Sequence, residues 1–491
     1  MRTNSLLPFV GSQAGSTDRR DSWPRHVGIL NDYVRIPYAN GSSFASQFLY
    51  REFTARGRKV TVLGPRDPHA RPEEVPPGAI CLPSLPFRNH PGVYLPFPGP
   101  ATLRQVADLG LDAVLAHSGT ALLDLGVWCR RALGTPFVAV NTVHLPSLYN
   151  VMLPDALEQN RVVRRVFQER IMPWAEEQSA IAYNNGDGLV VLSEGLVGYW
   201  RDRGVKVPIH VIPRSVAPSI FDRPAGADPF PGEAERGHRL LVVCRHTREK
   251  GVARLLEIFA KFIAPHNPRA TLTLVGDGPD HDTFKALAGT LGVADRTYFP
   301  GEYPVTEMTR WYSHADLFVY TSLSETYGQV VSEAMWCGLP VVAFADDMGV
   351  SQQVKDGENG ALLPPGPDAA HADFRFGNQV LSLLRSPERR AHLAARAARL
   401  ARERCAPEHS VRRFEDALLA ARDHLRDTRG DRRDNAPKHL ARWTGVHGLL
   451  AALGCLRAPA VLNRHGRRQP GWSGSGAAPS SASHAAPSRR R

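Results

Sequence analysis

Two glutamates, Glu325 and Glu333, lie eight positions apart around a glycine, Gly328. The apolar run 316–322 has the β-branched and aromatic content of a buried strand, and residues 330–336 alternate apolar and polar side chains as a helix does. The glycine turn therefore joins a strand of a parallel sheet to a helix, where free N–H groups and the helix dipole attract a phosphate. Carboxylates beside an anion site favour a sugar nucleotide as ligand. An isolated acid pair at this spacing would more often be a solvated acid and a helix-face acid.

Two cations, Arg245 and Lys250, follow a second predicted strand, 239–244. A guanidinium can bind a diphosphate through two parallel hydrogen bonds, and an ammonium acts on it as a point charge. A third strand and turn, 271–279, places Gly276 where the backbone must pass close to another group. A solvated basic turn and an ordinary glycine turn remain the alternatives for each motif taken alone.

In this order, the three motifs resemble the carboxyl-terminal domain of the retaining glycosyltransferases of family 4, which have the GT-B fold. The matching positions are Arg245, Lys250 and Gly251, then residues 275–279, then Ser322, Glu325, Gly328, Glu333, Ala334, Gly338 and Pro340. The resemblance extends over roughly residues 24–425 and implies an α/β protein with two Rossmann-like domains facing a cleft.

The resemblance also assigns roles to individual residues. The expected catalytic residues are Arg245, Lys250, Glu325 and His144. The expected nucleotide-sugar contacts are Gly41, Gly276, Tyr327, Gly328, Gln329 and Glu333. Catalysis would stabilise the charge that grows on the leaving diphosphate, while Glu325 orients the sugar hydroxyls and Glu333 the ribose hydroxyls.

Strands and helices also alternate through the amino-terminal half, as expected of a second Rossmann-like domain. The predicted organisation is a flexible N-terminus (1–23), an acceptor domain (24–212), a nucleotide-sugar domain (213–406), a helix that crosses back (407–426) and a basic, largely disordered tail (427–491). The segment 210–221 resembles the family's inter-domain junction. At this junction Arg214 and Ser215 replace the usual Asn-Gly pair, which leaves the details of the hinge open.

Two segments of the first domain are similar to the subgroup that transfers sugars to diacylglycerol or related lipids. The first contains Asp32, Pro37, Asn40 and Gly41. The second, residues 141–149, has Val143 and Leu145 where the subgroup has Tyr and Thr. His144 ends a predicted strand in this second segment, where the family places a histidine near the reacting sugar. A lone histidine at a strand end is more often structural, and His117 is the weaker candidate.

Length and composition suffice for two or three domains with hydrophobic cores: the chain has 491 residues, of which 43% are hydrophobic and 22% charged. The six cysteines show no CxxC or metal-ligand spacing, so we expect reduced thiols in a reducing compartment. No Asp-x-Asp pair follows a predicted strand, so we expect no cofactor and no metal requirement. The N-terminal apolar patch is too short for a secretory signal, and no run of about 18 apolar residues occurs, which predicts a cytoplasmic protein.

The net charge of +12 is concentrated in the tail. Residues 427–491 carry twelve Arg and Lys against three Asp, a net +9, which leaves +3 for the other 426 residues and argues against a nucleic-acid partner. Apolar residues of the tail recur at helical spacing between arginines: Trp443, Val446, Leu449, Leu450, Leu453 and Leu456. Such a stripe can lie on an anionic membrane surface, or it can pack as a helix on the protein body.

Three functions remain compatible with these residues. The favoured one is a retaining transferase that moves a hexose from a UDP- or GDP-sugar to a hydroxyl of a lipid such as diacylglycerol, as in glycolipid biosynthesis, either free in the cytoplasm or peripheral on the inner face of the membrane. The second is a transferase to a soluble sugar, sugar phosphate or polyol. The third is a non-catalytic sugar-nucleotide binding protein of the same fold, and an epimerase is a related option.

Overall fold

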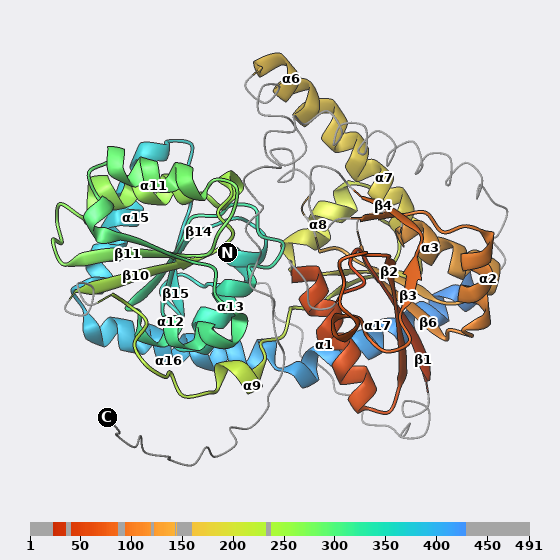
Figure 1. Cartoon of the computed structure of the whole chain (residues 1–491). Helices are drawn as coiled ribbons and strands as arrows, with labels where there is room; N and C mark the ends of the chain where they lie inside the picture. The colour runs from red at the N-terminus through yellow and green to blue at the C-terminus, as the bar shows by residue number, and fades with distance from the viewer. Residues whose placement is uncertain are drawn as a thin grey trace, which may run out of the picture.

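The computed structural model describes residues 23–35, 41–86, 94–118, 122–142, 144, 160–231 and 237–428. These residues form two α/β lobes, each built around its own parallel sheet (Figure 1). Most of the expected flexible N-terminus and of the basic tail fall outside these ranges. The two lobes confirm the predicted α/β class with two Rossmann-like domains.

The N-terminal sheet has the strand order β3-β2-β1-β6-β7-β8-β9, and every neighbouring pair is parallel. The strands are β1 (His26–Asn31), β2 (Lys59–Pro65), β3 (Ile80–Leu82), β6 (Ala113–His117), β7 (Phe137–Val140), β8 (Gly188–Val191) and β9 (Ile209–Val211). The helices are α1 (Gly41–Ala55), α2 (Pro100–Asp108), α3 (Leu122–Trp128), α6 (Arg161–Val166), α7 (Met172–Asn184) and α8 (Gly195–Asp202). A small antiparallel pair, β4 (Ser84–Pro86) and β5 (Tyr94–Pro96), lies beside the sheet.

The C-terminal sheet has the order β12-β11-β10-β13-β14-β15 and is also parallel. Its strands are β10 (His238–Val243), β11 (Ala270–Val275), β12 (Thr297–Gly301), β13 (Leu317–Tyr320), β14 (Val341–Phe344) and β15 (Gly360–Leu363). Its helices are α9 (Pro218–Phe221), α10 (Val252–Ile258), α11 (His281–Thr290), α12 (Met308–His314), α13 (Gln329–Trp336), α14 (Gly349–Gln353), α15 (Ala369–Leu384) and α16 (Pro387–Cys405). The strand order reverses beside β10, and parallel sheets bind ligands at the carboxyl ends of strands around such a reversal.

The last described helix, α17 (Pro407–Asp427), packs on the N-terminal sheet although it follows the C-terminal domain in the chain. Its buried face joins the core formed with β1, β6, β7 and β8 through Val411, Phe414, Ala417, Leu418 and Ala421. An ion pair of 2.8 Å between Arg58 and Glu415 adds to this contact at the surface. Figure 1 shows the chain passing from α16 in the C-terminal lobe to α17 in the N-terminal lobe, so the C-terminal helices tie one domain to the other. Among the described residues, none of the helices combines the length and apolarity needed to span a bilayer.

Candidate active site

Glycines bring the loops after β10 and β11 into close contact. A Cβ atom on Gly276, whose φ is +135°, would lie 1.9 Å from the carbonyl oxygen of Cys244. A Cβ atom on Gly278 would lie 2.4 Å from the carbonyl oxygen of His246. Side chains at either position would push the loops apart. The described structure thus gives Gly276 a packing role, and its contact with a ligand stays a prediction.

The two predicted cations differ in their surroundings. Lys250 ends the short turn Arg248–Lys250, and its Nζ lies 2.5 Å from Oε1 of Glu325. Gly251 allows this approach because a Cβ atom there would lie only 2.7 Å from the carbonyl oxygen of Thr321 at the end of β13. Arg245 is exposed, and its guanidinium makes no hydrogen bond or ion pair with the residues that the structure describes. Lys250 is therefore fixed, while Arg245 is available to a ligand.

Glu325 is buried at the carboxyl end of β13 and stays ionised. Its Oε1 accepts hydrogen bonds from Lys250, from the Tyr320 hydroxyl at 2.8 Å and from Ser322 at 2.8 Å. Burial alone would raise the pKa of Glu325, but the Lys250 charge and the donated hydrogen bonds lower it below its usual value. The same pair raises the pKa of Lys250 against the effect of burial. Its Oε2 receives no hydrogen bond from the described residues and is the atom left for a sugar hydroxyl.

The turn before α13 presents unpaired amides, as predicted from its glycine. Gly328 has a φ of +78° and precedes the first residue of the helix. Within the described part of the chain, the N–H groups of Gly328, Gln329 and Val330 donate no hydrogen bond. Such amides at a helix start, together with the helix dipole, form an anion site.

Glu333 lies one turn further along α13, and its carboxyl group has a pKa near neutral pH. It is 8% exposed, and Tyr312 donates a hydrogen bond of 2.9 Å to its Oε2. Burial raises the pKa of Glu333 to about 7, although the Tyr312 hydrogen bond acts in the opposite direction. Ribose hydroxyls that donate to this carboxylate would favour its ionised form.

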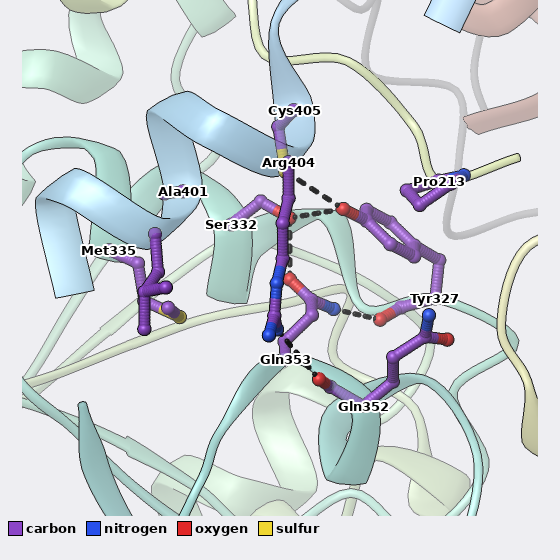
Figure 2. A pocket seen from close by; sticks show the side chains of 10 residues that line it. Pro213, Tyr327, Ser332, Met335, Gln352, Gln353, Ala401, Arg404 and Cys405 are labelled. Carbon is purple, nitrogen blue, oxygen red and sulfur yellow. Dashed lines mark hydrogen bonds between the residues drawn. The ribbon is translucent and has the colours of Figure 1, made fainter. Parts of the chain in front are cut away.

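The side chain of Tyr327 is buried within the C-terminal domain. Its hydroxyl lies 3.1 Å from Sγ of Cys405 and accepts a hydrogen bond of 3.0 Å from Ser332, while its carbonyl oxygen accepts from Gln353. Figure 2 shows these side chains around a pocket lined by residues of α13, α14 and α16 and by Pro213. The Tyr327 ring is thus packed within the domain, and a contact of this residue with the nucleotide sugar stays a prediction.

For the Gln329 side chain and Gly41, the described structure shows no ligand-facing position. The Gln329 side chain donates a hydrogen bond of 3.2 Å to the carbonyl oxygen of Ser215 in the inter-domain junction. Gly41 is the first residue of α1, and the loop before it, 36–40, lies outside the described residues. The same is true of residues 143 and 145–159, which include most of the second lipid-subgroup segment. The ligand contacts predicted for Gln329 and Gly41 stay predictions.

The two histidine candidates lie in different surroundings. The ring of His144 packs against that of Tyr199 on α8 with the centroids 5.4 Å apart and the planes tilted by 57°, and burial together with Arg203 lowers the pKa of His144. His117 ends β6, is completely buried, and lies near enough to Arg214 for that charge to act on it. Burial, with a smaller effect of Arg214, lowers the pKa of His117 to about 3. The catalytic role of His144 stays a prediction, while these contacts favour His117 as the histidine beside the junction.

Arg214 is the site residue that sequence reasoning did not assign. It was visible only as a replacement of Asn in the junction, and its neighbours are distant in sequence. Burial lowers the pKa of Arg214 to about 10, and electrostatic interactions with the Tyr327 hydroxyl and the Glu325 carboxylate act against that effect. The charge of Arg214 therefore acts on His117 of one domain and on Glu325 of the other.

The two domains touch along the edge of this site. Thr326, just before the unpaired amides, donates a hydrogen bond of 3.4 Å to the carbonyl oxygen of Thr142 after β7. The N–H of Glu194 lies 2.8 Å from Oε1 of Gln352. The candidate site is thus a C-terminal-domain surface bordered by the N-terminal sheet. In the described ranges, no group of three His, Cys, Asp or Glu side chains could hold a metal ion.

Known proteins resemble this chain in sequence. Residues 40–219 match the sequence model of Glycosyltransferase Family 4, and residues 228–400 match that of Glycosyl transferases group 1. The chain is 24% identical over 354 residues to the alpha-monoglucosyldiacylglycerol synthase of Streptococcus pneumoniae, covering 70% of this chain and 77% of the relative. It is 31% identical over 257 residues to the D-inositol 3-phosphate glycosyltransferase of Acidothermus cellulolyticus, covering 48% of this chain and only about half, 52%, of that enzyme.

A solved structure supports the fold assignment. The Anabaena protein Alr3699/HepE in complex with UDP superposes with a TM-score of 0.61 at 17% identity, over 80% of this chain and 100% of the Anabaena chain. The two sequence models together span most of the chain, and they confirm the resemblance that its motifs indicated. The chain belongs to the family 4 glycosyltransferases of the GT-B fold, enzymes that use nucleotide sugars.

Proposed function

We propose that this enzyme is a retaining hexosyltransferase that moves a hexose from a UDP- or GDP-sugar to a lipid hydroxyl, such as that of diacylglycerol. One observation carries the proposal. The Lys250–Glu325 pair and the unpaired amides at the start of α13 lie at one sheet edge that faces the other domain. The similarity to a monoglucosyldiacylglycerol synthase supports a lipid acceptor.

The mechanism follows from where these charges lie. The acceptor hydroxyl attacks C1 on the face from which the diphosphate departs, and a diphosphate oxygen takes the hydroxyl proton. As the C1–O bond breaks, charge grows on the diphosphate, where Arg245, Lys250 and the amides after Tyr327 stabilise it. Glu325 orients the sugar through its Oε2, because its Oε1 already accepts three hydrogen bonds. Glu333 binds the ribose hydroxyls.

Two further parts of the proposal concern metal and membrane. We expect transfer without an added metal ion, because two cationic side chains and a helix start already supply a positive field for the diphosphate. We also expect the basic tail, which lies outside the described residues, to hold the enzyme on an anionic membrane. The similarity to a D-inositol 3-phosphate glycosyltransferase supports transfer to a soluble acceptor as the second candidate function.

The test begins without an acceptor. The protein is incubated with a panel of UDP- and GDP-sugars, and slow release of the nucleotide identifies the donor. Diacylglycerol vesicles and a soluble polyol are then added in parallel, and the anomeric configuration of the product is read by NMR. A glycolipid with the donor's configuration supports the proposal. Transfer only to the polyol favours the second candidate, and nucleotide binding without any turnover contradicts both.

A further inference from the structure

The junction between the domains holds Arg214 in one place. Ser410 of α17 donates a hydrogen bond of 3.1 Å to the carbonyl oxygen of Pro213, and Gln329 of α13 donates one of 3.2 Å to that of Ser215. The next N–H, of Val216, donates to the carbonyl oxygen of Cys405 at 3.0 Å. The backbone on both sides of Arg214 is thus fixed by three helices, and its side chain starts from a rigid point between the domains.

The Arg214 guanidinium has no acceptor among the residues that the structure describes. Its Nε is completely buried and makes no hydrogen bond, and no ion pair involves its other nitrogens. With a pKa of about 10 it remains a cation at neutral pH. Glu325 does not neutralise it, because Lys250 already pairs with that carboxylate at 2.5 Å. A partly buried cation without an acceptor is costly, and such a group calls for a partner that the protein itself does not supply.

The neighbouring His117 is a second unpaired donor. Tyr33 donates its N–H to Oδ1 of Asn31 at 3.1 Å, which turns the Asn31 amide nitrogen toward Oγ of Ser46 at 2.5 Å. Ser46 can then donate only to Nδ1 of His117, at 2.7 Å. His117 is neutral, so its remaining proton lies on Nε2, which is buried and has no partner in the described structure. Arg214 and His117 thus offer donors and no acceptor.

We propose that Arg214 and Nε2–H of His117 bind an oxyanion, a phosphate or carboxylate, carried by the acceptor. The inference rests on the proposed transferase function and narrows its acceptor class. The donor's own diphosphate already has Lys250, Arg245 and the amides before α13, whereas His117 ends a strand of the other domain's sheet. A lipid with an anionic headgroup and a soluble polyol phosphate share the required chemistry.

The experiment compares matched acceptors in matched variants. Arg214→Asn installs the residue of the usual junction, Arg214→Lys keeps a charge, and Arg223→Asn changes an exposed arginine nearby as the control. Binding is measured with the nucleotide, UDP or GDP, at saturation. The soluble probes are glycerol 3-phosphate and glycerol, and the lipid probes are vesicles with phosphatidylglycerol or diacylglycerol. The vesicle arms are compared between variants, so the effect of the basic tail cancels.

We expect the wild type and Arg223→Asn to prefer the anionic member of at least one pair. Arg214→Asn should lower that preference roughly 10- to 100-fold, the range of a charge-assisted hydrogen bond, and Arg214→Lys should keep part of it. A preference for glycerol 3-phosphate alone identifies a soluble source, and one for phosphatidylglycerol alone a lipid source.

Three results would overturn the inference: no anionic preference in the wild type, a preference that survives in Arg214→Asn, or an equal loss of UDP affinity in that variant. The last would assign Arg214 to the donor diphosphate. Failure of the proposed function looks different, because the Arg214-dependent anion binding would persist while no nucleotide sugar is turned over.

Discussion

Replacement of Glu333 by Gln tests the site through the pH dependence of stability. Burial raises the pKa of Glu333 from 4.5 to about 7. Each unit of pKa shift corresponds to 1.36 kcal/mol, so the shift is worth about 3 kcal/mol. The folded protein holds this proton more tightly than the unfolded chain, so the free energy of unfolding without ligand falls as pH rises from about 4.5 to about 7. Gln stays neutral and can still accept the Tyr312 hydrogen bond.

Thermal unfolding at pH 5 and pH 8 measures this effect. Wild type and Glu333→Gln should unfold at similar temperatures at pH 5. At pH 8 the variant should be more stable by about 3 kcal/mol, or roughly 6 to 12 °C for a domain of this size. Glu302→Gln, at an exposed position of the same domain, is the control and should behave as the wild type at both values. An equal difference at both pH values, or a variant less stable at pH 8, would refute the argument.

Nucleotide binding should show the opposite preference. Ribose hydroxyls donate hydrogen bonds, so they stabilise the carboxylate that burial disfavours. Calorimetric affinity of the wild type for its nucleotide should therefore rise between pH 6 and pH 8. Glu333→Gln should bind more weakly at pH 8 and lose this dependence. The ionised Glu333 side chain would then lower the stability of the free enzyme while strengthening its binding of the nucleotide.

Three further predictions concern the charged groups. Arg245→Ala should lower kcat by about 10²- to 10³-fold but leave thermal unfolding unchanged, because that side chain is exposed. Lys250→Ala should lower kcat by a similar factor and also lower stability, because it leaves the buried Glu325 unpaired. Wild-type rates in both variants would contradict the site. Glu325→Ala should chiefly slow transfer and Glu333→Ala chiefly weaken nucleotide binding, and steady-state kinetics with equal effects on both parameters would show that the roles are wrongly divided. Deleting residues 429–491 should leave nucleotide binding intact but release the protein from anionic vesicles, and the attachment of the full-length protein should weaken as salt rises. Equal co-sedimentation of both forms would rule out a membrane role for the tail.

Local patterns were sufficient to predict the elements that carry the site. The predicted strand 316–322 contains β13, and the predicted helix 330–336 lies within α13. Both predictions depended on residue periodicity and on a glycine with positive φ between them, and these are properties of neighbouring residues. The unpaired amides follow from the same local geometry, because a helix start leaves its first N–H groups without partners.

Contacts between distant residues could not be predicted in the same way. Lys250 pairs with a carboxylate 75 positions away, so the sequence showed two cations for one diphosphate but not that one of them is tied to Glu325. Tyr327 lies inside the family motif, yet its hydroxyl contacts Cys405, 78 positions along the chain. The role of Arg214 depends on strands from both domains, so the sequence could show only that the usual Asn was missing.

The anion site and the hinge are mechanically connected within the C-terminal domain. Gln329, whose N–H is one of the unpaired amides, holds Ser215 of the junction through its side chain. The Tyr327 hydroxyl contacts Sγ of Cys405 (Figure 2). The carbonyl oxygen of the same cysteine accepts a hydrogen bond from the N–H of Val216. A diphosphate bound at the start of α13 would therefore contact the same residue that holds the segment carrying Arg214. Because that segment is already held by three helices and leads directly to the other domain, Arg214 should keep its position when the donor binds, so that the acceptor site is prepared before the acceptor enters.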